Sequence, residues 1–402
     1  MKIAMVVNQF PTISETFIIN KAIYLSKSGL DISIIVHSAK PKNNIKISQI
    51  NELNFQKIHY LQIFPGKFGY LLYLIGIIIR NPIYSIGLFF RSLKLYSGFR
   101  QSINSWILAL PLVKGKFDII HFEFSGIALV YMESFPLLKP VKLITSARGF
   151  AEQIKPIVEP KRKEKLKDLF TKLDKIHCVS IDMQNTLVTL GASIDKTFIN
   201  YPSIDTSFFQ CRILENYNNR NHLKLISVGR LHWKKGFIYL LQSIRILIEE
   251  GYNICLDIVG SGQEYEALLF DINELGLTKH INLLGSKSLN EIRDLLESSD
   301  IYIQPSLSEG LSNATLEAMS MKLPVISTSV GGMAEVIDDG INGYLVSSRN
   351  PEHIAEKIKL LINNPSTRQN FGTKAREKVI SLFDLSSQTR IFLSEYQKLI
   401  AK

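Results

Sequence analysis

Two carboxylates, Glu309 and Glu317, stand on either side of an expected helix start. Asn313 is the expected N-cap, with Ser312 as the weaker alternative, so the helix should run from about residue 314 to residue 321. The free N–H groups of such a first turn attract phosphate. Because Glu309 precedes the helix and Glu317 lies one turn inside it, the two acids can contact different parts of one ligand. We expect the same ligand to contact Gly310, Leu311, Ser312 and Asn313, an arrangement that suits a sugar nucleotide.

Two cations occur at a second expected helix start, in the segment GRLHWKKG at 229–236. Gly229 would let the backbone approach a ligand, and Arg230 and Lys235 would bring two positive charges to one point, which suits a diphosphate. The alternative for each cation is a surface ion pair. Lys234, one position away, is expected to face solvent. Fixed cations and aimed amides stabilise the charge of a leaving diphosphate, so we expect neither a metal nor a cofactor.

Glycines precede two further expected helix starts. Gly331 and Gly332 come before the helix of GGMAE and suit a close approach of the backbone. The segment VGSGQ at 259–263 contains Gly262, and two alternatives stay open for it, a plain turn or a loop that faces the nucleotide.

The elements that position these residues alternate regularly between strand and helix. Expected strands at 223–228, 254–259, 281–284 and 301–304 are separated by helices, which predicts a parallel sheet covered on both faces. The first half of the chain also opens with a strand, a helix and a strand. A chain of 402 residues exceeds what one core usually serves. We therefore expect an α/β protein with domains at 1–210 and 211–382, a final helical segment at 383–402, and a linker near 205–221.

Four residues of the first half are candidates for binding a second substrate. Ser14 and Glu15 lie in the loop that follows the first strand, where open α/β sheets place their ligands. His121 and Arg148 are expected at the ends of later strands and would face the same cleft. The alternatives are a helix N-cap for Ser14 and a structural role for His121.

Positive charge is concentrated in the first half. Residues 1–210 hold 26 Lys and Arg against 14 Asp and Glu, a net charge of +12, whereas residues 211–402 have a net charge of −1. Nucleic acid and anionic membrane are the usual partners of such a surface. The three cysteines fit no metal-ligand spacing and are expected to be reduced. The short apolar start at residues 3–7 predicts a strand instead of a signal peptide, so a cytoplasmic protein is expected.

Residues 61–116 contain seven basic and no acidic side chains, interleaved with aromatic ones. The apolar run at 70–79 is about half as long as a membrane-spanning helix requires. A helix lying in the membrane interface fits better, with Lys67, Arg80, Arg91, Lys94 and Arg100 toward the head groups. The alternative is a set of helices packed against the rest of the first domain.

The segments GRLHWKKG, PSLSEGLSNATLEAM and PVISTSVGGMAEVIDDGINGYLV, in this order, resemble family 4 of the retaining nucleotide-sugar glycosyltransferases. The resemblance covers about residues 223–382. The segments FPTISETFI and SEGLSNATLEAM are similar to the bacterial members that build capsule and exopolysaccharide. This resemblance implies the GT-B fold, in which two Rossmann-like doubly wound domains face a cleft, the second holding the donor and the first the acceptor.

The resemblance also implies roles for single residues. Glu309 would contact the transferred sugar near its anomeric carbon, Glu317 would bind the ribose hydroxyls, and Arg230 and Lys235 would hold the diphosphate. The C-terminal helix would return to the first domain. Many relatives carry His-Gly where this chain has Arg148-Gly149, so Arg148 would replace a histidine that contacts the acceptor. No general base is identified, and in a front-face mechanism the leaving phosphate can accept the proton.

These observations predict a retaining, metal-independent hexosyltransferase that uses a UDP- or GDP-sugar. The expected acceptor is a saccharide, lipid-linked, at the cytoplasmic face of the cell membrane; an anionic membrane surface is an expected partner and nucleic acid is not. One alternative is a sugar-nucleotide epimerase or a phosphorylase of the same fold. Another is a non-catalytic module that binds nucleotide-sugars.

Overall fold

The computed structural model describes residues 1–12, 16–39, 58–62, 75–76, 78–79, 82–211 and 222–401. Their contacts divide the chain into two units. Unit 1 consists of residues 1–179, 183–200 and 389–402, and unit 2 of residues 180–182 and 201–388. Residues 210 and 382, where the sequence suggested boundaries, both lie within unit 2. Part of the expected linker, residues 212–221, falls outside the described residues.

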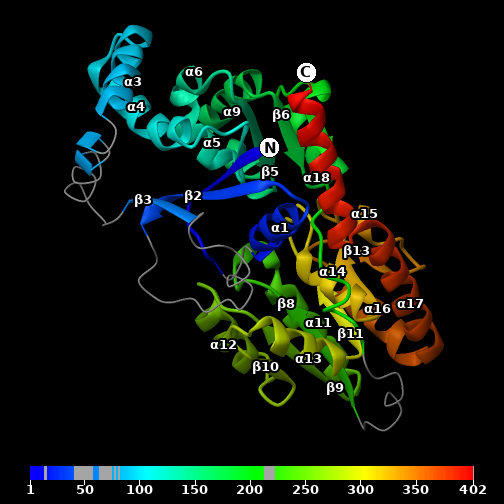
Figure 1. The fold of residues 1–402 in the computed structure, drawn as a ribbon. Coiled ribbons are helices and arrows are strands. Elements are labelled where there is room, and N and C mark those ends of the chain that lie inside the picture. The colour runs from blue at the N-terminus through cyan, green and yellow to red at the C-terminus, as the bar shows by residue number, and fades with distance from the viewer. Residues whose placement is uncertain are drawn as a thin grey trace. The chain divides into compact units, whose positions relative to one another are not determined.

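Unit 1 is built on a seven-stranded parallel sheet with the order β3-β2-β1-β4-β5-β6-β7 (Figure 1). The chain winds outward from β1 to β3 and then returns to the other side of β1 with β4. The carboxyl ends of β1 and β4 therefore form the switch point at which such sheets bind ligands. The strands are β1 (Lys2–Val7), β2 (Asp31–Ala39), β3 (Ile58–Gln62), β4 (Ile119–Phe122), β5 (Lys142–Ala147), β6 (Lys175–Cys178) and β7 (Thr197–Ile199).

Both faces of this sheet are buried. Neighbouring residues of a strand point to opposite faces, and in this sheet both sets are packed in an apolar core. In β1, Ala4 and Val6 belong to one apolar core, and Ile3, Met5 and Val7 belong to another. The covering helices are α1 (Thr16–Lys27), α3 (Pro82–Leu95), α4 (Phe99–Lys114), α5 (Ser125–Tyr131), α6 (Phe135–Leu138), α7 (Phe150–Gln153), α8 (Lys155–Val158), α9 (Pro160–Lys172) and α10 (Ile181–Thr189).

Unit 2 repeats this plan with a six-stranded parallel sheet in the order β10-β9-β8-β11-β12-β13. Its switch point lies between β8 and β11. The strands are β8 (Leu223–Val228), β9 (Ile254–Val259), β10 (Ile281–Leu283), β11 (Ile301–Gln304), β12 (Val325–Thr328) and β13 (Gly343–Val346). The expected α/β fold with two doubly wound sheets is confirmed. The strands β12 and β13 complete a sheet of which the sequence predicted only the first four strands.

The helices of unit 2 cover both faces of its sheet. They are the 3₁₀ turn η6 (Trp233–Lys235), α11 (Phe237–Glu249), α12 (Tyr265–Glu274), α13 (Leu289–Glu297), α14 (Asn313–Ser320), α15 (Met333–Val336), α16 (Pro351–Asn363) and α17 (Pro365–Leu382). The last helix, α18 (Leu385–Ile400), begins in unit 2 and ends in unit 1. Its residues Phe392, Tyr396 and Leu399 are buried in a core of unit 1 that also contains residues of β1.

Candidate active site

The two loops that carry the expected chemistry meet at the switch point of unit 2. One follows β8 and leads through η6 into α11, and the other follows β11 and leads into α14. Gly236 lies between η6 and α11 with a φ of 64°. A Cβ at this position would lie 2.3 Å from the carbonyl oxygen of Pro305, so only glycine lets the loops pack this closely. The amide of Leu307 donates to the carbonyl of Lys234 over 2.7 Å, which joins the loops directly.

The centre of the site is an ion pair between the Lys235 ammonium and Oε1 of Glu309. The hydroxyl of Ser306 donates to the same oxygen over 2.8 Å. The Glu309 side chain is 9% exposed. Burial alone would raise the pKa of Glu309, but Lys235, Lys234 and the Ser306 hydroxyl outweigh it, and the pKa lies below its ordinary value. Glu309 is therefore an ionised carboxylate with a fixed orientation.

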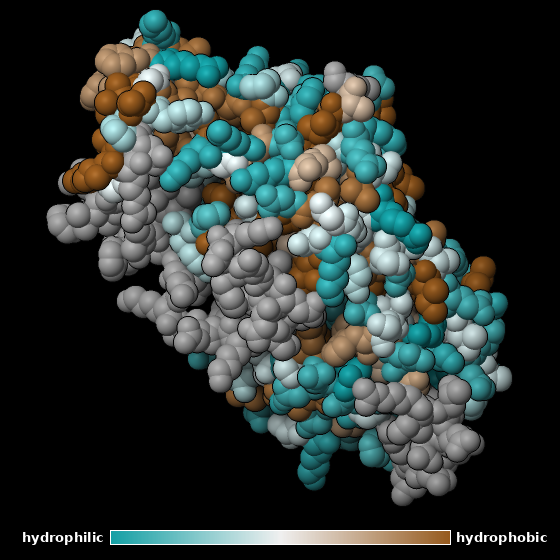
Figure 2. All heavy atoms as spheres, in the orientation of Figure 1, coloured by the Kyte–Doolittle hydropathy of each residue, from teal (hydrophilic) through white to brown (hydrophobic). Residues whose placement is uncertain are grey.

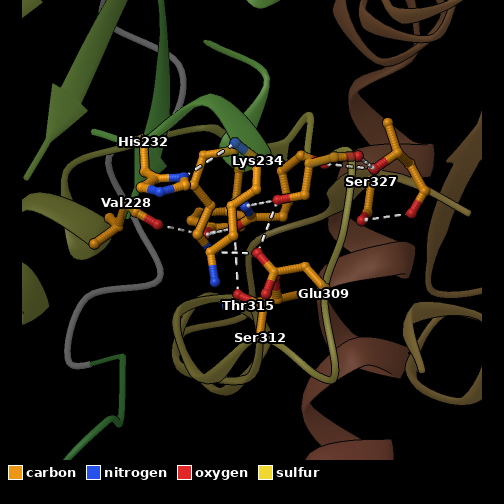
Figure 3. A network of polar contacts seen from close by, with 12 residues as sticks. Val228, His232, Lys234, Glu309, Ser312, Thr315 and Ser327 are labelled. Atoms are coloured by element: carbon orange, nitrogen blue, oxygen red, sulfur yellow. Dashed lines mark hydrogen bonds and ion pairs between the residues drawn. The ribbon is translucent and has the colours of Figure 1, made fainter. Parts of the chain in front are cut away.

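Glu309 belongs to a network of polar contacts (Figure 3). The Tyr302 hydroxyl donates to Oε1 of Gln304 over 2.7 Å, and Nε2 of Gln304 donates to the Ser306 hydroxyl over 2.7 Å. The Ser306 oxygen therefore accepts from Gln304, and the Ser306 hydroxyl proton is donated to Glu309. The residues Tyr302, Gln304 and Ser306 are buried, so each needs these partners. The sequence analysis assigned no role to Tyr302 or Ser306.

The cations of the first loop differ in environment. Lys235 is paired with Glu309, whereas Arg230 is exposed to solvent. Lys234 is half-buried, and the expectation that it faces solvent is wrong. Its pKa is lowered by burial and by the charges of Lys235 and Arg230, although Glu309 opposes the change. Lys234 and Lys235 thus act on Glu309, and Arg230 lies within electrostatic reach of Lys234.

The start of α14 corrects the expected N-cap. Ser312 has an extended backbone and its hydroxyl accepts a hydrogen bond from the amide of Thr315, whereas Asn313 is the first helical residue. Ser312 also donates to Oε1 of Gln304 over 3.3 Å, and this second contact favours it as the cap. In the described part of the chain, no acceptor reaches the amides of Asn313 and Ala314, which remain available to a ligand.

Glu317 lies one turn inside α14, as expected, and is partly buried. Burial raises the pKa of Glu317 to about 8. Among the described residues, none forms a hydrogen bond or an ion pair with its carboxyl group. Its environment is thus opposite to that of Glu309, which is ionised and paired.

The remaining glycines serve the packing of one loop on another. A Cβ at Gly262 would lie 2.1 Å from the carbonyl oxygen of Leu231, and at Gly331, where φ is 55°, it would lie 1.8 Å from that of Glu309. At Gly229 the nearest atoms belong to the Lys235 side chain, at 3.3 Å. The amide of Gly332 donates to the carbonyl of Gly310 over 2.8 Å, which fixes the loop next to Glu309.

Glu335 of α15 has a positioning role that the sequence analysis missed. Its carboxylate accepts hydrogen bonds from the amides of Ile181 and Asp182 over 2.9 and 3.0 Å, and from the Tyr201 hydroxyl over 3.0 Å. It thus satisfies two free amides at the start of α10. The acidic residue three positions after Gly332 could have been recognised as a helix-capping group, but its partners are distant in the sequence.

Of the four candidates in the first half, Ser14 and Glu15 lie outside the described residues. The structure describes the other two, His121 and Arg148. His121 is completely buried within β4 and its nitrogens bond to the Tyr396 hydroxyl and to Ser146. Because its side chain has no exposed surface, a direct contact with an acceptor is not available to it. Arg148 follows β5, and its side chain is 17% exposed.

Comparison with known proteins identifies the part of the chain that holds the site. Residues 214–378 match the family model described as "Glycosyl transferases group 1". This part of the chain is a group 1 glycosyl transferase domain. It contains both loops, from Arg230 to Glu317, so the family expected from the sequence is confirmed at this level.

Relatives match the group 1 glycosyl transferase domain and the rest of the chain. The amylovoran biosynthesis glycosyltransferase AmsK of Erwinia amylovora is 26% identical over 96% of this chain and 96% of its own length. The capsular polysaccharide biosynthesis glycosyltransferase CapM of Staphylococcus aureus is 32% identical over 42% of this chain and 46% of its own. The chain is thus similar to enzymes named for exopolysaccharide and capsule synthesis.

Solved structures show the same fold. The crystal structure of Anabaena HepE in complex with UDP has a TM-score of 0.74 and 16% identity, and the match covers 99% of this chain and 100% of that one. A second structure of HepE contains UDP-glucose. At this identity the likeness shows the fold, and the expected GT-B class is confirmed.

Proposed function

We propose that this chain is a retaining, metal-independent glycosyltransferase. It moves a hexosyl group from a UDP- or GDP-sugar to a saccharide acceptor, lipid-linked, in the synthesis of a cell-surface polysaccharide. The observation that carries the proposal is the pair of unlike acids at the switch point of unit 2. Glu309 is ionised and held by Lys235, whereas Glu317 has a raised pKa and no partner among the described residues.

The cations and amides of the site suit a diphosphate. Lys234 and Lys235 carry two positive charges close to Glu309, Arg230 adds a third within electrostatic reach of Lys234, and Glu309 neutralises only one of the three. The amides of Asn313 and Ala314 add two hydrogen-bond donors at a helix N-terminus, where the helix dipole favours an anion. Such charges stabilise a leaving diphosphate without help from a metal.

The two carboxyl groups contact different parts of the donor in this proposal. Glu317 is partly buried and lacks a partner, so it accepts hydrogen bonds from the ribose hydroxyls. Ionised Glu309 stabilises the positive charge that develops at the anomeric carbon. Its low pKa argues against a role as proton donor.

The reaction proceeds on one face of the sugar. The bond between the anomeric carbon and the diphosphate oxygen breaks, and the acceptor oxygen forms the new bond on the same side. The proton of the acceptor hydroxyl passes to the leaving phosphate oxygen, so the configuration is retained and no protein base is needed. The structures of HepE with UDP and UDP-glucose support a UDP-sugar as the first donor to test.

The test is transfer of labelled hexose from UDP- and GDP-sugars to a bacterial membrane lipid extract by the full chain. We expect label in the lipid fraction, with α configuration at the new bond for an α-linked donor. Release of nucleotide without a saccharide acceptor would favour an epimerase or a phosphorylase. Binding of UDP without any release would favour a non-catalytic module.

The proposal includes attachment to an anionic membrane surface on its cytoplasmic side through α3 and α4. The buried side chains of α3 are Ser85, Leu88 and Ser92, whereas most of its large apolar side chains are exposed, unlike the usual pattern of a surface helix. Figure 2 shows hydrophobic side chains at the surface over this pair of helices. The exposed apolar residues of the two helices are Ile83, Tyr84, Ile86, Phe90, Leu95 and Phe99.

Serine residues between α3 and α4 explain why the large apolar side chains are exposed. The Ser92 hydroxyl donates to the carbonyl of Ser102 over 2.6 Å, and the Trp106 indole donates to the carbonyl of Ser85 over 2.9 Å. The helices are therefore close together and their larger side chains are left outside. The exposed basic residues Arg91, Lys94 and Arg100 lie on the same two helices, whereas Lys67 and Arg80 of the expected set lie outside the described residues. In the described chain, every helix is too short or too polar to span a bilayer.

Co-sedimentation with vesicles tests the attachment. We expect binding to vesicles that contain phosphatidylglycerol at low salt, weaker binding at high salt, and little binding to phosphatidylcholine vesicles. Ile83→Glu should reduce binding at least tenfold, because Ile83 is 88% exposed on α3. Ile194→Glu changes an exposed isoleucine elsewhere in unit 1 and should have little effect. Absence of binding at low salt would remove this part of the proposal.

A further inference from the structure

Unit 1 contains a buried group of charges at its own ligand edge. Glu123 follows β4 and is completely buried. One of its carboxylate oxygens accepts from the Lys21 ammonium over 2.7 Å, and the other accepts from Nη2 of Arg148 over 2.8 Å. The carbonyl of Glu123 also accepts from Nε of Arg148 over 3.1 Å. One carboxylate thus holds two cations, and the group has an excess positive charge.

Neighbouring groups do not remove this excess. His177 donates from Nε2 to the carbonyl of Asn200, so its Nδ1 accepts from Ser146, and Ser146 in turn accepts from Nε2 of His121. This order of donors fits two neutral imidazoles. Burial lowers the pKa of both His121 and His177 well below the ordinary value, and the nearby cations lower it further.

A second buried carboxyl group of unit 1 is that of Glu152. It accepts from the Ser125 hydroxyl and from the amide of Gly149, and it lies within electrostatic reach of Arg162. Burial raises its pKa. Among the described residues, three cations then face two carboxyl groups when Glu152 and Arg162 are included, so an excess of one positive charge remains.

Arg148 is the member of this group that a ligand can reach. Its guanidinium lies 4.2 Å above the ring of Phe17, and hydrogen bonds to Glu123 engage Nε and Nη2. Two of the five N–H groups of an arginine are thereby used. The other three have no acceptor among the described residues, and the side chain is 17% exposed. A guanidinium held on one edge and one face is preorganised to bind an oxyanion with its free edge.

A cavity lies next to this group at the switch point of unit 1. It has a volume of about 360 Å³ and is lined by Asn8, Gln9, Phe124, Gly126, Ile127 and Val130. The ring of Phe124, which lines the cavity, lies 5.8 Å from the Arg148 guanidinium. Two amide side chains and an aromatic ring are suited to a saccharide, because they combine hydrogen bonds with an apolar surface.

We infer that Arg148 selects acceptors that carry an acidic group, a carboxylate or a phosphate, next to the saccharide. The inference rests on the proposed function, since it names the class of acceptor for that reaction. The free edge of Arg148 forms a paired hydrogen bond with the two oxygens of the acid, and the excess charge of the buried group is neutralised on binding. Lys21 and Glu123 are positioning residues, because they act through Arg148.

The test compares matched probes on the full chain saturated with UDP, so that the donor site is occupied. The probes are methyl α-glucuronide against methyl α-glucoside, and geranyl diphosphate against geraniol, with binding measured by titration calorimetry. We expect the acidic member of at least one pair to bind at least tenfold more tightly than its neutral match. A preference within the saccharide pair would indicate that the acidic group is a uronate. A preference within the isoprenoid pair would indicate that it is a lipid phosphate.

Variants then assign the preference to Arg148. Arg148→Gln should abolish the preference for the acid, and Arg148→Lys should retain part of it, because the charge remains but the paired geometry is lost. Arg349→Gln, which removes an exposed arginine of unit 2 that belongs to neither proposed surface, should leave the preference intact. Equal binding of acidic and neutral probes, or an unchanged preference in Arg148→Gln, overturns the inference. Failure to bind UDP in the first place would instead count against the proposed function.

Discussion

Lys235 and Glu309 stand 74 positions apart in the chain and form an ion pair at the switch point of unit 2. The pair joins the loop after β8 to the loop after β11, whose strands are neighbours in the sheet. The negative charge of Glu309 is thus balanced within the protein before a donor arrives. A diphosphate that binds Lys235 must share this cation with Glu309.

The first prediction concerns Lys235. Lys235→Gln should reduce transfer at least a hundredfold. It removes a cation that faces the leaving group in the proposed reaction, and also the main group that keeps Glu309 ionised. Transfer of labelled sugar measures the effect, and thermal unfolding should show a folded protein. Lys374→Gln, in an exposed ion pair with Glu377, is the matched control and should retain activity. Activity of Lys235→Gln within fivefold of the original chain would contradict the assignment.

The second prediction uses the pKa of Glu317, which burial raises from 4.5 to about 8. Between these values the unfolded carboxyl group has lost its proton while the folded one retains it. The free energy of unfolding therefore falls as the pH rises through this window, by at most about 1.4 kcal/mol per pH unit from this group. Above about pH 8 the group is ionised in both states and its contribution no longer changes.

The Glu317→Gln variant has no group that ionises at this position, so its free energy of unfolding does not fall in this way as the pH rises. The difference in melting temperature between Glu317→Gln and the original chain should therefore increase in favour of the variant from pH 5 to pH 8. Glu377→Gln, at an exposed site, should show no such trend. A difference that stays constant over this range would show that the carboxyl group of Glu317 titrates normally.

The third prediction concerns Ser306, whose hydroxyl lies between Gln304 and Glu309. Ser306→Ala should leave Nε2 of Gln304 without its acceptor and Glu309 without a donor, at a cost of about 1–3 kcal/mol in the free energy of unfolding. Turnover should fall about tenfold because Glu309 is less well oriented. Ser299→Ala removes a hydroxyl that bonds only to a helix carbonyl and serves as the control. Unchanged turnover in Ser306→Ala would mean that Lys235 alone orients Glu309.

The fourth prediction compares two glycines with positive φ. Gly331→Ala and Gly276→Ala, with φ of 55° and 70°, should each cost about 1 kcal/mol from backbone strain. At Gly276 no atom lies within 4 Å of the added Cβ, whereas at Gly331 the carbonyl oxygen of Glu309 lies 1.8 Å away. Only Gly331→Ala should therefore displace the Glu309 loop and weaken UDP binding, measured by titration calorimetry. Equal UDP affinity in the two variants would count against this role of Gly331.

Much of unit 2 could be predicted from the sequence because its strands are short apolar runs separated by helices with regular spacing. The strand at 301–304 was expected with the bounds that the structure shows, and Glu317 was expected inside the following helix. These features depend on local patterns, which the sequence contains. The loop composition also sufficed to predict that Lys235 and Glu309 belong to one site.

Other features depend on contacts between distant residues and left no local pattern. The choice of Ser312 over Asn313 as the N-cap is favoured by the bond from Ser312 to Gln304. The burial of His121 involves Tyr396, which lies 275 positions away on α18. Tyr302 and Ser306 are common core and loop residues, and only the geometry shows that they support Glu309.

The two sheets share one winding order, in which the first strand of each unit lies beside the fourth. Each unit therefore builds its own binding edge from two of its own loops. In the proposed function, donor recognition belongs to the segments after β8 and β11, and acceptor recognition belongs to those after β1 and β4. If the proposed function holds, exchange of the unit 1 loops between relatives would change the acceptor while the nucleotide-sugar stays the same, so recombination would give a direct route to new polysaccharides.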